Sequence, residues 1–380
     1  MTAPDSIPLI EHVDALVESV RALVVIESPT ADIDACAMAV SAAHQVCGHW
    51  VTSPARIEEH EGRPVLRWGP EHPEVLLLGH LDTVWPLGTL ERLPWTCDAS
   101  RMTGPGVFDM KAGVVQAMAA IGLLNLGPDD GVGLLLTTDE ETGSHCSRTI
   151  ISRAITSARA VLVFEPSLDG ALKTSRKGTS WYRAELTGRA AHAGLDPERG
   201  INALLAAARL SIATLDWADP AAGTTVTPTV LIAGTTANTV PAQANLTIDV
   251  RAWTAAEQQR VDASVRGWAP LEGSIILDGG IDRPAMEASS SERLFELAGE
   301  CAGELGLPPL AQASVGGASD GNLTAAAGVA TLDGLGAVGD GAHADHEWAS
   351  VADLAPRTAL AAALIRRILD EKPGEQLDNK

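Results

Sequence analysis

Three short apolar runs, at residues 75–78, 133–138 and 160–164, are separated by longer stretches with helical spacing. Runs of this length with few polar residues are typical of central strands in a parallel sheet, because both faces of such strands are buried. Residues 110–127 lie between the first two runs and have the spacing of a helix that ends at Gly127. The alternation of strand and helix predicts an α/β domain whose mostly parallel sheet is flanked by helices.

The pattern changes after about Gly178, where strands with alternating apolar residues begin. The expected order is strand, helix, strand, strand, helix, strand, which is the ferredoxin-like βαββαβ pattern of an α+β domain. The expected elements are strands at 180–188, 225–234, 244–253 and 273–280 and helices at 197–218 and 254–269. We therefore expect a larger α/β domain made of residues 1–178 and 285–380, with a smaller domain of residues 179–284 inserted into it.

Composition narrows the classes of partner. The 380 residues carry a formal net charge of -22, and 46% of them are hydrophobic, which is enough to bury sizeable cores. A surface this acidic repels phosphate backbones and anionic lipid, so we expect no nucleic-acid partner and no membrane partner. The five cysteines form no CxxC pair, and the N-terminus lacks a basic segment followed by an apolar one. These features predict free thiols and a soluble cytoplasmic protein.

Acidic and histidine side chains follow the predicted strands. His80 and Asp82 come after the first run, the pair Glu140 and Glu141 after the second, and Glu165 after the third. Two more candidates lie in loops, Asp109 in GPGVFDMK and His343 in GAHADHE. The carboxyl ends of parallel strands meet at one edge of a sheet, so these side chains can converge there. Taken singly, a strand-end histidine is more often structural, but this ordered set of nitrogen and oxygen ligands suits zinc.

In this order the motifs resemble those of the zinc aminoacylase and carboxypeptidase family of metallopeptidases. That family includes acetylornithine deacetylase, succinyl-diaminopimelate desuccinylase and the folate-cleaving bacterial glutamate carboxypeptidases, and the resemblance to the last group is strongest. It covers essentially the whole chain, the insert included. It implies a zinc-exopeptidase-like catalytic domain and an inserted domain that serves for dimerisation and as a lid.

The resemblance also implies a role for each candidate. Asp109 would bridge two Zn²⁺ ions, for which Co²⁺ or Mn²⁺ could substitute. His80 and Glu165 would complete one metal site, and Glu141 and His343 the other. His346 lies close to His343, but only His343 has a glutamate four residues later, which is the spacing usual in the family.

Two further residues would act beside the ligands. Asp82 would orient the imidazole of His80. Glu140 would be the general base, since a carboxylate that binds no metal is needed to take a proton from the attacking water and pass it to the leaving nitrogen. The family usually has a cis peptide bond after the bridging aspartate, which places one at Asp109–Met110.

The expected substrate contacts come from loops. Arg283 matches an arginine that holds the carboxylate beside the scissile amide, and an arginine fork suits that task. Gly317 lies in GGASDG, which resembles a glycine-rich loop of the same pocket. Lys173 aligns with a lysine that engages a second carboxylate, although an ordinary surface lysine is an equal alternative. His192 and Asn238 match residues that stabilise the oxyanion from the other subunit, which implies a homodimer joined through the insert.

The expected activity is metal-dependent hydrolysis of a peptide or N-acyl bond to a C-terminal amino acid, with glutamate preferred. The alternative within enzymes is an N-acyl amino acid deacylase of the acetylornithine deacetylase or succinyl-diaminopimelate desuccinylase type. A non-catalytic binding protein that has kept the fold is less consistent with the sequence, because every expected ligand and Glu140 are present.

Overall fold

The computed structural model describes residues 13–371, and these form two compact units. The main unit contains the described residues up to Ser175, together with Ala288–Ser314 and those from Ser319 onward. The inserted unit contains Arg176–Glu287 and the short segment Val315–Ala318. The insert expected at residues 179–284 falls within the longer of these two segments.

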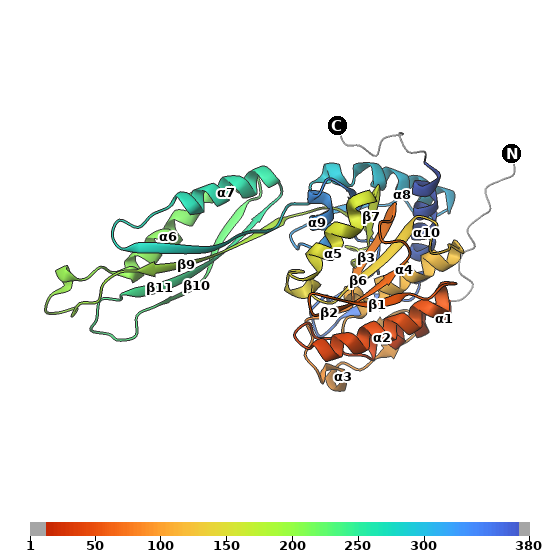
Figure 1. Ribbon diagram of the computed structural model, residues 1–380, viewed down its shortest axis with the longest axis horizontal. Coiled ribbons are helices and arrows are strands. Elements are labelled where there is room, and N and C mark those ends of the chain that lie inside the picture. The colour runs from red at the N-terminus through yellow and green to blue at the C-terminus, as the bar shows by residue number, and fades with distance from the viewer. Residues whose placement is uncertain (1–12, 372–380) are drawn as a thin grey trace. The chain divides into compact units, whose positions relative to one another are not determined.

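The main unit is built on a six-stranded sheet (Figure 1). Its central strand β3 is parallel to β6 on one side and to β7 on the other, and β14 extends the parallel part. The antiparallel hairpin of β1 and β2 closes the other edge. In sheet order the strands are β1 (Arg56–His60), β2 (Arg63–Trp68), β6 (Val132–Thr137), β3 (Val75–His80), β7 (Ala160–Val163) and β14 (Ala330–Leu332). The prediction of an α/β domain with a mostly parallel sheet is confirmed.

Helices cover both faces of this sheet. The helices of the main unit are α1 (Val13–Val24), α2 (Ile33–Trp50), α3 (Thr89–Arg92), α4 (Ala112–Leu123), α5 (Ser147–Ala154), α8 (Glu292–Glu304), α9 (Asp320–Ala326) and α10 (Leu354–Asp370). Alternate residues of β3 face opposite cores, as Val75 and Leu77 pack with α4 and α10 while Leu76 and Leu78 pack with α5. Each buried leucine contributes about 2 kcal/mol through the hydrophobic effect, and burial on both faces explains why the run carries no polar residue.

Short strands complete the main unit. A small four-stranded sheet has the order β15, β16, β5, β4, and a two-stranded sheet joins β13 to β8. Their bounds are β4 (Thr96–Cys97), β5 (Arg101–Thr103), β8 (Leu172–Arg176), β13 (Gln312–Val315), β15 (Gly339–Asp340) and β16 (Trp348–Ser350). The small sheet matters for the site, because β15 and β16 flank the loop that carries His343.

The inserted unit has the predicted βαββαβ order. Its antiparallel sheet has the strand order β10, β11, β9, β12, which is that of a ferredoxin-like fold. The elements are β9 (Gly178–Thr187), α6 (Ala203–Trp217), β10 (Thr225–Ala233), β11 (Gln243–Ala252), α7 (Ala255–Gly267) and β12 (Ser274–Arg283). Buried residues of β9 and β11 pack with residues of α6 and α7 in a core of their own.

Two expected helices differ in their bounds. The helix expected from Pro197 begins at Ala203, because Ile201 forms an isolated bridge with Arg189 and Asn202 caps the helix through the backbone N–H of Leu205. The helix expected at 110–127 is shorter, since an irregular turn occupies Val107–Lys111 and α4 ends at Leu123. Apolar residues at helical spacing also predict a helix at residues 9–24, of which the structure describes Val13–Val24 as α1, and residues 9–12 lie outside the described part of the chain. Within residues 13–371, no helix combines the length and apolar character needed to cross a bilayer.

Candidate metal centre

The parallel strands deliver the predicted side chains to one edge of the main sheet. His80 is the last residue of β3, Glu141 lies in the turn after β6, and Glu165 follows β7 by two residues. Because β6, β3 and β7 are neighbours in that order, their carboxyl ends lie side by side. Asp109 comes from the irregular turn before α4, and His343 from the loop between β15 and β16.

These residues form two groups that share one member. Nε2 of His80 lies 3.3 Å from Oδ1 of Asp109 and 3.5 Å from Oε1 of Glu165. Nε2 of His343 lies 3.4 Å from Oδ2 of Asp109 and 3.2 Å from Oε2 of Glu141. In each group of three, one ligand atom per residue lies within 4.8 Å of the others. Asp109 therefore presents one oxygen to each group, which is the arrangement of a bridging carboxylate.

Two buried oxygen atoms at this place have no hydrogen bond. Oδ1 of Asp109 and Oε1 of Glu141 are both buried and accept none. An unsatisfied buried carboxylate oxygen is costly in a protein, and coordination of a cation is a common way to satisfy it. The donor set of two imidazoles and three carboxylates fits zinc and similar divalent ions. The residues present thus fit a metal centre.

The electrostatics also favour cations here. Burial lowers the pKa of His80, but its contacts with Asp109, Asp82 and Glu165 outweigh burial and raise the pKa well above its ordinary value. Contacts with Asp109 and Glu141 raise the pKa of His343 to about 10. The surrounding carboxylates therefore favour the positively charged form of both imidazoles when no metal is bound.

The carboxylate of Asp82 contacts a threonine hydroxyl and the backbone of the next loop. Its carboxylate accepts hydrogen bonds from the backbone N–H of Glu140 at 3.3 Å and of Glu141 at 3.2 Å, and from the hydroxyl of Thr30 at 2.7 Å. Nδ1 of His80 lies 2.9 Å from the backbone carbonyl of Asp82 and 3.5 Å from its carboxylate. Asp82 thus contacts His80 mainly through its backbone and holds the glutamate pair through its side chain. Thr30 carries no motif and was not expected.

The turn around Asp109 is held by a second buried carboxylate, that of Glu347. It accepts hydrogen bonds from the backbone N–H groups of Gly106, Phe108 and Asp109. The peptide bond Asp109–Met110 is cis, which confirms the expectation. Gly106 has a φ of +75°, and a Cβ there would meet Cγ2 of Thr83 at 2.6 Å, so only glycine fits the turn. From the sequence, Glu347 served only to distinguish His343 from His346 by its spacing, and its hydrogen bonds to this turn were not expected.

Glu140 belongs to neither group of three in the described part of the chain. It is partly exposed at the start of the turn after β6, with Glu141 as its neighbour. His346 is also outside both groups, and it lines a separate surface pocket instead. Lys173 lies on β8, where its backbone N–H donates to the carbonyl of Asp333.

The other predicted site residues lie in the inserted unit. His192 and Asn238 are exposed and come from paired segments, since the N–H of Ala193 donates to the carbonyl of Asn238 at 2.9 Å. Arg283 is the last residue of β12 and is buried. The carbonyl of Gly317 accepts a hydrogen bond from Nη1 of Arg176 at 3.0 Å. The structure thus brings His192 and Asn238 together within this unit, and the roles of all four residues stay predictions.

The comparisons with known proteins agree with this geometry. Residues 76–367 match the model of the peptidase family M20/M25/M40. Carboxypeptidase G2 of Pseudomonas sp. (strain RS-16) is 32% identical over 311 residues, which cover 77% of this chain and 73% of that protein.

Solved structures show the same fold at low sequence identity. Aminopeptidase PepT from Bacillus cereus has a TM-score of 0.72 at 20% identity and covers 95% of this chain and 100% of its own. The M20 family metallo-carboxypeptidase Sso-CP2 from Sulfolobus solfataricus has a TM-score of 0.66 at 15% identity and covers 94% and 99%. The resemblance predicted from the motifs is confirmed. The chain belongs to the peptidase family M20/M25/M40, a family of metal-dependent hydrolases.

Proposed function

We propose that this protein is a two-zinc carboxypeptidase that hydrolyses a peptide or N-acyl bond to a C-terminal amino acid, with glutamate preferred. The observation that carries the proposal is the position of Asp109, whose two carboxylate oxygens face different groups of three ligand residues. A single metal site would need only one such group. The similarity to carboxypeptidase G2 supports the type of bond.

The ligands divide between the two groups. His80, Asp109 and Glu165 would hold one zinc ion, and Asp109, Glu141 and His343 the other, with Co²⁺ or Mn²⁺ as substitutes. When bound, the ions act as Lewis acids, which polarise the scissile carbonyl and lower the pKa of the attacking water. Oδ1 of Asp109 and Oε1 of Glu141 support this assignment, because both are buried and neither accepts a hydrogen bond.

Glu140 would be the general base. It lies next to the ligand Glu141 but outside both ligand groups, so it would not bind either metal ion. It would take a proton from the attacking water and then deliver that proton to the leaving nitrogen. The backbone N–H groups of both glutamates donate hydrogen bonds to the carboxylate of Asp82, and these bonds fix the position of the backbone that carries the pair. Asp82 would therefore orient this pair as well as the imidazole of His80.

Recognition of the substrate would use its carboxylates. Arg283 would bind the carboxylate beside the scissile amide, because a guanidinium pairs with a carboxylate through two hydrogen bonds. The backbone around Gly317 would line the same pocket. Lys173 would bind the side-chain carboxylate of a glutamate, and this assignment rests on sequence resemblance alone.

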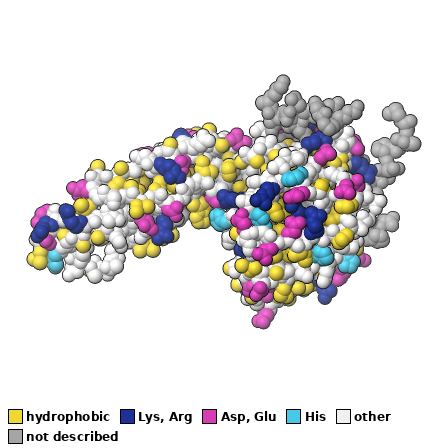
Figure 2. Space-filling model, viewed as in Figure 1, with side chains coloured by type: hydrophobic (Ala, Val, Ile, Leu, Met, Phe, Trp, Pro, Cys, Tyr) yellow, Lys and Arg dark blue, Asp and Glu magenta, His cyan; other side chains and the backbone are white. Residues whose placement is uncertain are grey.

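We further propose a homodimer joined through the inserted unit, in which His192 and Asn238 donate hydrogen bonds to the oxyanion in the other subunit's site. Hydrophobic side chains are exposed on α6 and on the edge strand β10 of the inserted unit, and the face in Figure 2 shows such side chains along this unit. The exposed set is Leu204, Leu205, Ile212, Leu215, Val230, Leu231 and Ile232. An apolar surface beside an unpaired strand edge is typical of an interface.

A panel of substrates tests the proposed specificity. The zinc-loaded enzyme is assayed for amino acids released from peptidyl-glutamate, N-acyl-glutamate, N-acetyl-ornithine and neutral N-acyl amino acids. We expect the highest kcat/KM with a glutamate conjugate. Lys173→Met should lower the preference for glutamate over a neutral residue by about tenfold, the usual worth of one charged hydrogen bond, and Lys177→Met serves as the matched control. Faster turnover of N-acetyl-ornithine would instead establish the deacylase alternative.

A further inference from the structure

One carboxylate, that of Glu347, collects hydrogen bonds from four N–H groups. Oε1 accepts from the backbone of Phe108 at 2.9 Å and of Asp109 at 3.1 Å. Oε2 accepts from the backbone of Gly106 at 2.9 Å and from the indole Nε1 of Trp85 at 2.9 Å. The side chain is buried, so water does not compete for these bonds. Both oxygens thus each serve two donors, which only an ionised carboxylate can do.

Through these hydrogen bonds, Glu347 connects two segments that carry predicted metal ligands. It lies four residues after His343, in the loop that joins β15 to β16. The three backbone donors belong to the turn that carries Asp109. The side chain of Glu347 therefore connects the loop that carries His343 to the turn that carries Asp109. Glu347 and Asp109 are 238 residues apart in the sequence.

We propose that Glu347 is a positioning residue that sets the distance between Asp109 and His343, and hence the affinity of the metal site that these two residues share with Glu141. It would not contact substrate or metal itself. The inference rests on the metal centre under the proposed function. Glu347 would affect the metal affinity of the His343 site more than that of the His80 site. The reason is that the imidazole of His80 is positioned separately, by the backbone carbonyl of Asp82.

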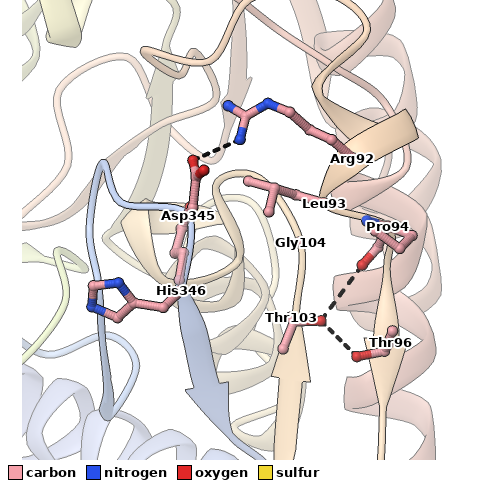
Figure 3. Close-up of a pocket in the computed structure, with 9 residues that line it drawn as sticks. Arg92, Leu93, Pro94, Thr96, Thr103, Gly104, Asp345 and His346 are labelled. Atoms are coloured by element: carbon pink, nitrogen blue, oxygen red, sulfur yellow. Dashed lines mark hydrogen bonds and ion pairs between the residues drawn. The ribbon is translucent and has the colours of Figure 1, made fainter.

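The chain offers a matched control on the same loop. Asp345 also lies between His343 and Glu347, but its carboxylate is exposed and pairs with Nη1 of Arg92 at 2.6 Å (Figure 3). Both residues of this ion pair line a surface pocket of about 200 Å³, together with Thr103 and His346. The guanidinium of Arg92 lies 5.4 Å from the ring centre of Trp85. Asp345 thus has the same charge and nearly the same place in the loop, without any bond to the turn of Asp109.

The test compares Glu347→Gln with Asp345→Asn by titration of the metal-free proteins with Co²⁺. The absorption spectrum of the bound ion reports its ligand geometry, and His343→Ala identifies which of the two binding steps belongs to the His343 site. We expect Glu347→Gln to weaken that step by at least about tenfold and the other step by less than about threefold, since the amide cannot accept at one of its two positions. Asp345→Asn should change neither step by more than about twofold.

Each other result has a definite meaning. Equal affinities in Glu347→Gln and the unmodified protein would overturn the inference while leaving the metal centre intact. Failure of the unmodified protein to bind two ions would overturn the proposed function itself. Equal weakening of both steps, with a lower unfolding temperature of the metal-free protein, would assign Glu347 a merely structural role and also overturn the inference. If Glu347→Gln does not fold, Glu347→Asp replaces it, and unchanged affinity for the His343 site in that variant would count against positioning.

Discussion

Nε2 of His343 lies 3.4 Å from Oδ2 of Asp109, although Asp109 lies in the turn before α4 and His343 in the loop between β15 and β16, 234 residues later in the chain. The contact forms because the turn before α4 and the loop between β15 and β16 meet at the carboxyl edge of the main sheet. It completes the second of the two groups that share Asp109.

The two adjacent glutamates should respond differently to the same substitution. Glu140→Gln should lower kcat by about 100-fold or more and leave metal content unchanged, because under the proposed function Glu140 accepts a proton and binds no metal. Glu141→Gln should lower the affinity for one of the two ions, because Oε2 of Glu141 lies 3.2 Å from Nε2 of His343 in one ligand group. Metal analysis and steady-state kinetics on both variants provide the measurement. Loss of metal in Glu140→Gln with retention in Glu141→Gln would reverse the two roles.

Asp82→Asn should affect catalysis through the glutamate pair. The amide keeps one acceptor oxygen, so one of the three N–H and O–H donors from Thr30, Glu140 and Glu141 loses its partner. A lost charge-assisted bond of this kind costs about 2 kcal/mol, and we expect kcat to fall by roughly tenfold or more. Thr30→Val removes a single donor and should have a smaller effect. An unchanged kcat in Asp82→Asn would show that the pair is held by other contacts.

Metal uptake should release protons. Contacts with Asp109 and Glu141 raise the pKa of His343 to about 10, so this imidazole is protonated at neutral pH before metal binds. A histidine binds a metal only in its neutral form, and binding must therefore expel the proton. The apparent metal affinity should rise with pH up to about 10. Calorimetric titration in buffers of different ionisation enthalpy measures the released protons, and a binding heat that is independent of the buffer would contradict the prediction.

The raised pKa of His343 also predicts how the stability of the metal-free protein changes with pH. A folded-state pKa that is raised from 6.5 to about 10 stabilises the fold fully below pH 6.5, and this contribution is lost as the pH rises through about 10. The metal-free protein should therefore become less stable between these values. His343→Ala should lose much of this pH dependence. Urea unfolding curves at several pH values make the comparison.

The proposed dimer can be tested by placing a charged side chain on the exposed apolar surface of the inserted unit. Leu215 on α6 has 73% of its surface exposed, and Met38 on α2 of the main unit has 60%. Leu215→Arg should convert the protein to monomers and lower kcat, because the oxyanion donors His192 and Asn238 would come from the other subunit. Met38→Arg is the control and should leave the dimer intact. Sedimentation velocity and kinetics decide the matter, and a monomeric Leu215→Arg with full activity would remove the oxyanion role from these two residues.

The elements and the ligand candidates could be predicted from the sequence because their signals are local. The run at 75–78 lacks polar residues because β3 is buried on both faces, and His80 follows the run directly. The βαββαβ order of the insert is likewise visible as alternating periods. The start of α6 was predicted wrongly, because Pro197 indicates a helix start but Ile201 pairs with Arg189 instead.

The supporting contacts could not be predicted because they depend on tertiary structure. Thr30 donates to Asp82 from 52 residues away, and Glu347 accepts from Asp109 across 238 residues. Thr30 has no local pattern that distinguishes it from an ordinary threonine, and the spacing of Glu347 from His343 does not indicate which backbone groups it contacts. The antiparallel hairpin of β1 and β2 was also missed, since the residues of β1 are mostly polar and exposed.

The number of metal ions bound per chain is the decisive measurement for the two-metal centre. The purified protein is stripped with a chelator and titrated with zinc, while bound zinc and hydrolytic activity are measured on the same samples. Because Asp109 serves two ligand groups, we predict about two ions per chain and full recovery of activity only as the second ion binds. Saturation at one ion with full activity, or activity in the stripped protein, would contradict the two-metal centre.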